Sequence, residues 1–199
     1  MSKQRVFLTG ATGGMGFASL KEMLKDTDKQ NIVILARNSE KNREILAPYR
    51  NTAGLEIVWG DLNDYEVVLK CVKDCDLILH IAAFVSPAAD YHPKQAMKVN
   101  YGSTRNLINA IYALGQQDKT CLVYIGTVAE TGDRMPPIHW GRVGDPIKPS
   151  MFDYYAVSKV AAERLVIESG LKYWASLRQT GIIGKAMSQI NDAKSICPY

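Results

Sequence analysis

Short apolar runs alternate with amphipathic segments along most of the chain. The runs have the β-branched and aromatic content of strands and read RVFLT, NIVILA, LEIVW, DLILHIAA, CLVYIG and YWASLRQTGII. Stretches such as IVIL and LILHI are apolar on successive residues, which is typical of parallel strands covered by helices on both faces. The intervening periodicity predicts helices over residues 14–25, 64–73, 93–114 and 154–169. This order predicts an α/β fold built on a doubly wound parallel sheet.

Composition narrows the class of protein without identifying it. The 199 residues, 47% of them hydrophobic, are enough for one domain with a substantial core. The net charge of +4 comes from 24 basic and 20 acidic residues that are interspersed, so no nucleic-acid surface is expected. We expect no membrane span and no signal peptide, and therefore a soluble cytoplasmic protein. The cysteines, at 71, 75, 121 and 197, lack metal-ligand spacing and are expected to be reduced thiols.

Glycines are concentrated where the first strand hands over to the first helix, in TGATGGMG. Gly10, Gly13 and Gly16 follow a G-x-x-G-x-x-G spacing, with Gly14 between them. A helix N-terminus after such a turn offers unpaired N–H groups to a phosphate, and glycine lets the ligand approach the backbone. We predict that this turn, including Thr12 and Met15, holds the pyrophosphate of a dinucleotide. A flexible glycine-rich turn without a ligand is the alternative.

The end of the second strand distinguishes between two dinucleotides. An NAD-binding fold usually carries an acid there, but this chain has Ala36 and Arg37, with Lys41 and Arg43 nearby. A guanidinium can form a bidentate pair of hydrogen bonds with a 2′-phosphate. Arg37 therefore favours NADP(H) over NAD(H), and a solvated arginine at a strand end is the alternative.

The next two strand ends offer further contacts to the same cofactor. Asp61, in WGDLND, has two alternative roles. It either accepts a hydrogen bond from the adenine amino group, with Leu62 packed on the adenine ring, or it caps the following helix. Ala82 and Ala83, in HIAA, are small enough for the backbone to lie along the cofactor. We interpret His80 as a hydrogen-bonded core histidine.

The fifth strand and the last helix carry the candidate chemistry. Thr127 ends the strand in YIGT, and Tyr155 and Lys159 in YYAVSK are four residues apart, on one helix face. A nearby ammonium lowers the pKa of a phenol toward a range useful for proton transfer. The three residues predict a general acid/base site, although a threonine in a strand and a surface Tyr/Lys pair are each common without any such role.

Together, TGATGGMG, GDLND, HIAA, VNYGSTRNL, YIGT, YYAVSK and LRQTGIIG resemble the extended short-chain dehydrogenase/reductase family, also called the NAD-dependent epimerase/dehydratase family. The resemblance covers nearly the whole chain and implies a Rossmann-type fold. It implies that Tyr155 is the catalytic acid/base, that Lys159 binds the nicotinamide ribose and tunes the tyrosine, and that Thr127 bonds the substrate oxygen. It also implies that Asn100 braces the helix of the active site.

The resemblance also carries expectations about assembly and domains. It implies a homodimer formed by the two long helices that contain Asn106 and Val160. Because family members continue into a further domain, we expect an NADP-binding domain over 1–184 and, over 185–199, the start of a substrate-binding region or a tail, with most of that second domain absent. Gly126 and Thr131 stand where the family usually has a serine and a tyrosine, which argues against a nucleotide-sugar epimerase.

Three functions follow from these residues. The first is an NADP(H)-dependent oxidoreductase that moves hydride between the nicotinamide and a carbonyl or alcohol. The second is a nucleotide-sugar epimerase or dehydratase that keeps NAD bound. The third is a non-catalytic dinucleotide-binding module, a sensor or assembly subunit. Such a module would not need Thr127, Tyr155 and Lys159 together, which argues against it.

Overall fold

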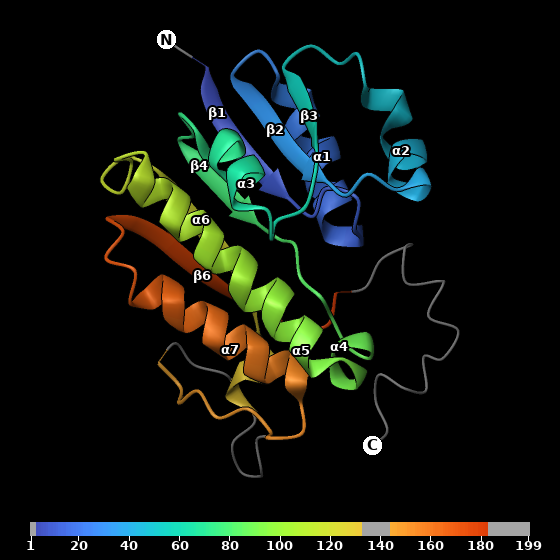
Figure 1. The fold of residues 1–199 in the computed structure, drawn as a ribbon. Coiled ribbons are helices and arrows are strands. Elements are labelled where there is room, and N and C mark those ends of the chain that lie inside the picture. The colour runs from blue at the N-terminus through green and yellow to red at the C-terminus, as the bar shows by residue number, and fades with distance from the viewer. Residues whose placement is uncertain (1–2, 133–143, 183–199) are drawn as a thin grey trace.

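The computed structural model describes residues 3–132 and 144–182, and these form a parallel sheet of six strands in the order β3-β2-β1-β4-β5-β6 (Figure 1). Every neighbouring pair in the sheet is parallel. The strand order reverses between β1 and β4, which is where such folds bind ligands. The strands are β1 (Gln4–Thr9), β2 (Gln30–Ala36), β3 (Leu55–Trp59), β4 (Leu77–His80), β5 (Cys121–Thr127) and β6 (Tyr173–Gln179).

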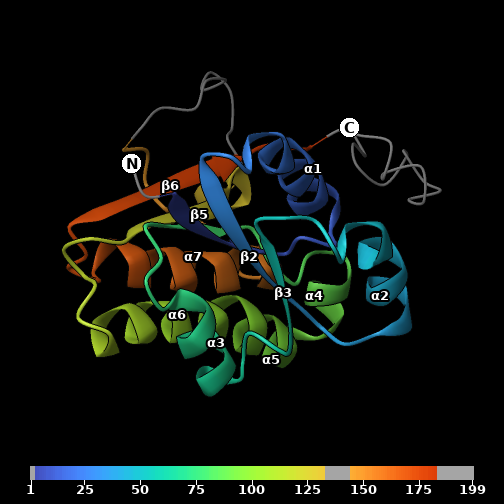
Figure 2. The same cartoon turned by 90° about the horizontal axis from the view of Figure 1, so that it is seen from above.

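Helices cover both faces of the sheet, as predicted for a doubly wound fold. Helices α3, α6 and α7 lie on one face and α1 on the other (Figure 2). The α-helices are α1 (Gly14–Met23), α2 (Glu40–Leu46), α3 (Tyr65–Val72), α4 (Ala88–Tyr91), α5 (Pro93–Ala96), α6 (Gly102–Ala113) and α7 (Tyr154–Ile167). The short helical turns are η1 (Leu24–Asp26), η2 (Ala47–Tyr49), the π-helical η3 (Met97–Tyr101) and η4 (Val128–Thr131).

The core consists of two layers, one on each face of the sheet. Phe7 of β1 packs toward α3, α6 and α7, whereas the next residue, Leu8, packs toward Leu20 of α1 and Leu46 of α2. Successive side chains of a strand point to opposite faces, so a strand covered on both sides must be apolar at every position. Each fully buried side chain of this size contributes about 1.5–3 kcal/mol. The uninterrupted apolar runs of the sequence therefore have a direct structural cause.

The structure corrects several predicted boundaries. The helix predicted over 93–114 is interrupted by the π-helical turn η3. β4 ends at His80 and β6 at Gln179, so residues 81–83 and 180–182, which the apolar pattern included, are not part of these strands. Helices α2 and α4 were not predicted, because seven and four residues are too short for a clear period. Ser39, which caps α2 by accepting from the amide of Asn42, is the local signal that was available. The expected segment over 185–199 lies outside the described residues.

His80 is a core histidine that joins β1 to α6. The amide of Ala82 donates to the Thr9 hydroxyl over 3.0 Å, and that hydroxyl is hydrogen-bonded to Nδ1 of His80 at 2.9 Å. The Thr104 hydroxyl donates to the Asn100 carbonyl and therefore accepts from Nε2 of His80, at 3.1 Å. Burial, with a smaller effect of the Lys159 charge, lowers the pKa of His80 to about 3. The neutral ring thus fixes the end of β4 beside the glycine turn.

Candidate active site

The glycine turn is packed tightly against the end of β4. Gly10 has a φ of +74°, and a Cβ there would lie 2.8 Å from the Ala82 amide nitrogen. A Cβ on Gly16 would lie 2.1 Å from the carbonyl oxygen of Gly10, which only glycine avoids. The Gly13 amide donates to the same oxygen over 2.9 Å. These contacts explain why the turn needs glycine at both ends of the motif.

The N-terminus of α1 is open. No described side chain caps it, and Gly13 and Gly14 are both exposed, while Thr12 and Met15 are half-buried in the same turn. The first N–H groups of a helix lack partners within it and carry the positive end of its dipole. This part of the predicted site therefore fits an anionic group such as a pyrophosphate.

The other predicted cofactor residues follow the neighbouring strands at the same edge of the sheet. Arg37 follows β2 and is exposed, and Leu62, Ala82 and Ala83 are half-buried after β3 and β4. Leu62 packs on the core under α3. The structure thus places the glycine turn at the same edge of the sheet as Arg37, residues 61–62 and residues 82–83. Ala82 is in contact with Gly10.

Asp61 does not cap the helix that follows it. Its Oδ1 accepts from the backbone N–H and the side-chain amide of Asn63, both at 2.8 Å. The cap of α3 is Asp64, which accepts from the amides of Glu66 and Val67. The capping alternative for Asp61 is therefore wrong, and its role toward adenine stays a prediction.

Thr127, Tyr155 and Lys159 meet where β5 ends and α7 begins. The Thr127 hydroxyl lies close enough to the Tyr155 phenol to lower its pKa. Lys159 is almost fully buried, and its Nζ donates to the Ile125 carbonyl over 2.7 Å and lies 4.1 Å from the ring centroid of Tyr124. The structure thus brings the threonine near the tyrosine and places the lysine one helical turn after the tyrosine on α7.

The acidity of the tyrosine differs from the sequence-based expectation. Burial raises the pKa of Tyr155 to about 12, while the hydrogen bond with Thr127 lowers it and the nearby Glu130 and Asp153 raise it. The prediction that the lysine holds this pKa below its ordinary value is wrong for this structure, because desolvation outweighs favourable contacts. Burial likewise lowers the pKa of Lys159 to about 8, although the negative charges of Glu130 and Glu163 raise it.

Asn100 holds the helix of this site in place. Its side-chain amide donates to the Ser158 hydroxyl over 2.8 Å and to the Phe84 carbonyl over 3.0 Å, and its oxygen accepts from the Phe84 amide over 2.7 Å. The Ser158 hydroxyl in turn donates to the Tyr155 carbonyl. The bracing role implied for Asn100 matches these bonds, whereas its contact with a cofactor stays a prediction.

Sequence reasoning missed a buried charged cluster beside the lysine, formed by Glu130, Glu163 and Arg178. Two signals were available. The spacing T-x-x-E from Thr127 to Glu130 is a capping box, which η4 forms. Glu163 follows Lys159 by four residues and so shares its helix face. Neither signal indicates that the two acids meet.

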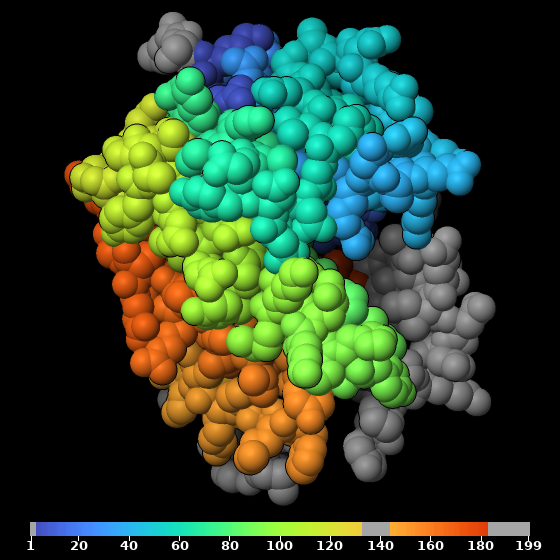
Figure 3. Space-filling view, in the orientation of Figure 1, coloured from blue at the N-terminus to red at the C-terminus, as the bar shows by residue number. Residues whose placement is uncertain are grey.

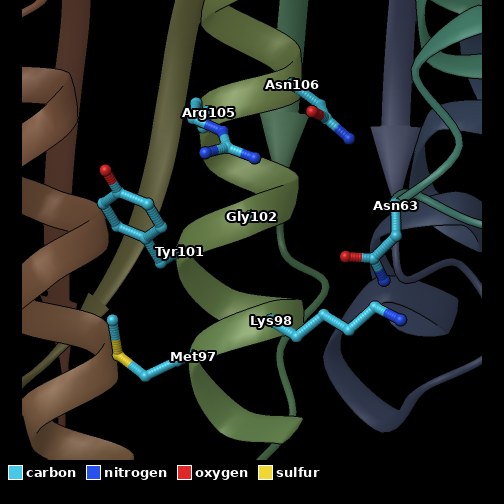
Figure 4. Close-up of a pocket in the computed structure, with 7 residues that line it drawn as sticks. All are labelled: Asn63, Met97, Lys98, Tyr101, Gly102, Arg105 and Asn106. Carbon is cyan, nitrogen blue, oxygen red and sulfur yellow. The ribbon is translucent and has the colours of Figure 1, made fainter. Parts of the chain in front are cut away.

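A pocket of about 340 Å³ lies away from these residues, on the outer side of η3 and α6. Figure 4 shows Lys98 and Asn63 on one side of the helix and Met97 and Tyr101 on the side that faces α7. Asn106 also lines this pocket. It therefore belongs to η3, α6 and the segment before α3 rather than to the glycine turn or to Tyr155.

Residues 3–132 and 144–182 contain neither a metal-binding cluster nor a membrane-spanning helix. No group of three or more His, Cys, Asp and Glu side chains is arranged to hold a metal ion. None of the helices in these ranges is long and apolar enough to cross a bilayer.

An open glycine turn, a reversal of strand order and a tyrosine with a lysine one turn later together define a Rossmann-type, dinucleotide-dependent class of protein. The sequence matches the NAD dependent epimerase/dehydratase family over residues 6–196, and the chain belongs to that family. The family expected from the motifs is confirmed.

Individual relatives cover a range of activities. The chain is 28% identical over 128 residues to a UDP-N-acetylglucosamine 4,6-dehydratase (inverting) of Campylobacter jejuni, covering 60% of this chain and 38% of that protein. It is 28% identical over 197 residues to a 3 beta-hydroxysteroid dehydrogenase/Delta 5-->4-isomerase of vaccinia virus, covering 89% and 52%. A dTDP-glucose 4,6-dehydratase of Bacillus anthracis, solved in complex with NAD, has the same fold, with a TM-score of 0.76, 17% identity and coverage of 92% and 56%. The chain thus spans about half the length of these relatives, or less.

Proposed function

We propose that this chain binds a nicotinamide dinucleotide and carries the acid/base residues of an oxidoreductase that interconverts a carbonyl and an alcohol. The observation that carries the proposal is the placement of Thr127 at the end of β5 beside Tyr155, with Lys159 one turn later and bonded to β5 through the Ile125 carbonyl, at the edge of the sheet where the glycine turn opens. Hydroxyl and phenol groups placed together can hold one carbonyl oxygen between them.

The residues present fit the cofactor. Its pyrophosphate matches the open N-terminus of α1, and Arg37, exposed after β2, supports a 2′-phosphate and hence NADP(H) over NAD(H). NAD is the cofactor in the solved dehydratase named above, so NAD(H) is the competing choice. When bound, the nicotinamide supplies or accepts the hydride.

The protein's own groups handle the proton. Tyr155 donates its phenolic proton to the carbonyl oxygen in reduction and takes it back in oxidation, and Thr127 bonds the same oxygen. Lys159, which has a pKa of about 8, is mostly an ammonium at neutral pH and supplies positive charge on the helix face of Tyr155. Burial raises the pKa of Tyr155, which keeps the phenol protonated and ready to donate.

A nucleotide-sugar dehydratase or epimerase is the second candidate, favoured by the relatives named above. Against it, Gly126 and Thr131 lack the hydroxyl and the ring expected on the substrate side. Gly126 has a structural reason to be small, since a Cβ there would lie 3.2 Å from Oε1 of Glu130 and from Cγ of Arg178.

We also propose a homodimer through α6 and α7, with a cytoplasmic location as a further prediction. The two helices lie side by side on the surface, in yellow-green and orange in Figure 3. Exposed apolar side chains line them, among them Met97, Tyr112, Val157 and Ile167. Sedimentation analysis should give a dimer for the chain and a monomer for Val157→Glu, with Val85→Glu, exposed elsewhere, as the control.

Calorimetric titration with NADPH and NADH, followed by a screen of carbonyl compounds, tests the enzymatic proposal. We expect NADPH to bind more tightly, and Tyr155→Phe to abolish turnover while leaving cofactor affinity nearly unchanged. Binding without turnover in either form would favour the non-catalytic module. Equal turnover of the Tyr155→Phe variant would overturn the role assigned to the tyrosine.

A further inference from the structure

Glu130 is fully buried on the turn η4, three residues after Thr127. Its Oε1 accepts the backbone N–H of Thr127 over 3.2 Å. Its Oε2 lies 3.2 Å from Nε of Arg178 but has no hydrogen-bond donor. One oxygen of this buried carboxyl group therefore lacks the partner that buried polar atoms normally have.

The guanidinium of Arg178 is directed at another acid. Its Nε and Nη2 donate to Oε2 of Glu163 over 3.1 and 3.0 Å, and the Ser176 hydroxyl donates to Oε1 of Glu163. Glu163 is therefore a well-bonded carboxylate. Two buried carboxyl groups thus share one guanidinium, and ionising both would place two buried negative charges beside it, which the Lys159 ammonium offsets only in part.

We propose that Glu130 is a protonated carboxylic acid at neutral pH, donates through Oε2 to Glu163, and by holding this proton acts as a positioning residue for Tyr155 and Lys159. The proton supplies the donor that Oε2 lacks, because a protonated carboxyl group is both a donor and an acceptor. A neutral Glu130 also leaves the guanidinium of Arg178 to Glu163 alone.

The electrostatics of the cluster support this assignment. Burial and the bond to Glu163 raise the pKa of Glu130 to about 8. Burial opposes ionisation of Glu163, yet hydrogen bonds with Glu130, Arg178 and Ser176 hold its pKa below the ordinary value. Because Glu163 accepts from Arg178 and Ser176 while Oε2 of Glu130 has no donor, the proton of the pair is assigned to Glu130.

Every element packed against Glu130 brings a titratable or charged group toward it. These groups are Tyr124 from β5, Tyr155, Lys159 and Glu163 from α7, and Arg178 from β6. When Glu130 releases its proton to solvent base, the new negative charge raises the pKa of both Tyr155 and Lys159. The phenol then becomes a weaker acid, so the protonated form of Glu130 favours proton donation.

Gly126 gives this cluster its space. A Cβ at that position would lie 3.2 Å from both Oε1 of Glu130 and Cγ of Arg178. Glycine at position 126 therefore leaves the space that the carboxyl group of Glu130 and the side chain of Arg178 occupy.

Infrared difference spectra between about pH 6 and about pH 10 test the proton directly. We expect a carboxylic-acid C=O band that disappears in alkali, is absent from Glu130→Gln, and persists in the control Glu168→Gln, an exposed acid of the Arg164 ion pair. Glu163→Gln should also remove the band, because the glutamine amide can donate to an ionised Glu130. Absence of the band from the native chain, or its survival in Glu130→Gln, would overturn the proposal.

Thermal unfolding gives a second measurement that a merely structural contact would not reproduce. The folded-state pKa of Glu130 is raised above its unfolded value, so the native state holds an extra proton between about pH 4.5 and about pH 8, and stability falls as the pH rises through this window. Glu130→Gln mimics the protonated acid and should remove this part of the slope. An unchanged slope would contradict the proposal.

The effect on Tyr155 rests on the proposed function. Once a substrate is known, the rate of the native chain should fall above about pH 8, and Glu130→Gln should move that fall to higher pH. An unmoved fall would remove Glu130 from the positioning role. The infrared band needs neither cofactor nor turnover, so failure of the enzymatic proposal and failure of this one are distinguishable.

Discussion

The side-chain amide of Asn100 donates to the Ser158 hydroxyl over 2.8 Å, so the π-helical turn η3 is bonded directly to the helix of Tyr155. The same side chain satisfies both the N–H and the carbonyl of Phe84, after β4. π-Helical turns are rare and are frequent at functional sites. Here the turn holds a buried amide that links two sides of the site.

Asn100→Ala should lower the free energy of unfolding by about 3 kcal/mol, because it removes three hydrogen bonds of a buried side chain, two with the backbone of Phe84 and one with Ser158. Asn106→Ala, which removes one bond to the Leu62 carbonyl, should cost about 1 kcal/mol. Urea unfolding of both variants measures the difference. Equal losses would show that Asn100 is no more than an ordinary helix residue.

Gly16→Ala should disrupt the glycine turn. The new Cβ would lie 2.1 Å from the Gly10 carbonyl oxygen, a backbone atom that cannot move without the turn, so we expect a loss of about 1–3 kcal/mol together with weaker cofactor binding. Gly13→Ala places its Cβ at an ordinary 3.4 Å from the same oxygen and should cost less than about 1 kcal/mol. Melting curves and NADPH titration of both variants provide the test, and a Gly16→Ala protein that binds like the native chain would refute the close packing.

His80 should make the fold sensitive to acid. Its folded-state pKa is lowered to about 3, so below about pH 6.5 the unfolded chain takes up a proton that the native state refuses, and stability falls as the pH falls. The loss due to this group should reach about 2 kcal/mol at about pH 5. His80→Asn should flatten the slope of melting temperature against pH, whereas the exposed His92→Gln should not. Identical slopes for the three proteins would contradict a neutral buried ring.

The fold was largely predictable because its signals are local. Buried strands have to be apolar at every position, and α7 shows its start in Asp153, which caps it by accepting from the Ala156 amide. The glycine spacing likewise reports contacts between residues only six positions apart, Gly10 and Gly16.

The rest of the site depends on contacts between distant segments. Glu130, Glu163 and Arg178 lie in a turn, a helix and a strand, and nothing in their local sequence says that they meet. The acidity of Tyr155 was misjudged for the same reason, since the Tyr/Lys spacing does not reveal the burial that raises the pKa of the tyrosine. The π-helical turn left no local pattern that distinguishes it from a regular helix.

Arg37→Ala tests the choice of cofactor. If the exposed guanidinium after β2 pairs with a 2′-phosphate, its loss should weaken NADPH binding by about 10- to 100-fold, which is the range for hydrogen bonds to a charged group. NADH binding should change by less than about threefold, because NADH lacks the phosphate. Arg43→Ala, whose side chain already donates to Asn38 over 2.6 Å, is the matched control for general loss of positive charge.

The salt dependence separates a direct ion pair from a diffuse potential. A direct pair should make Arg37→Ala lose affinity for NADPH far more than Arg43→Ala at both low and physiological ionic strength, because close pairs are screened less than distant charges. Equal effects of the two variants, which vanish in salt, would indicate only a diffuse positive field at this strand end. Equal weakening of NADPH and NADH by Arg37→Ala would mean that the arginine contacts a part common to both cofactors, and NADP(H) would lose its main support.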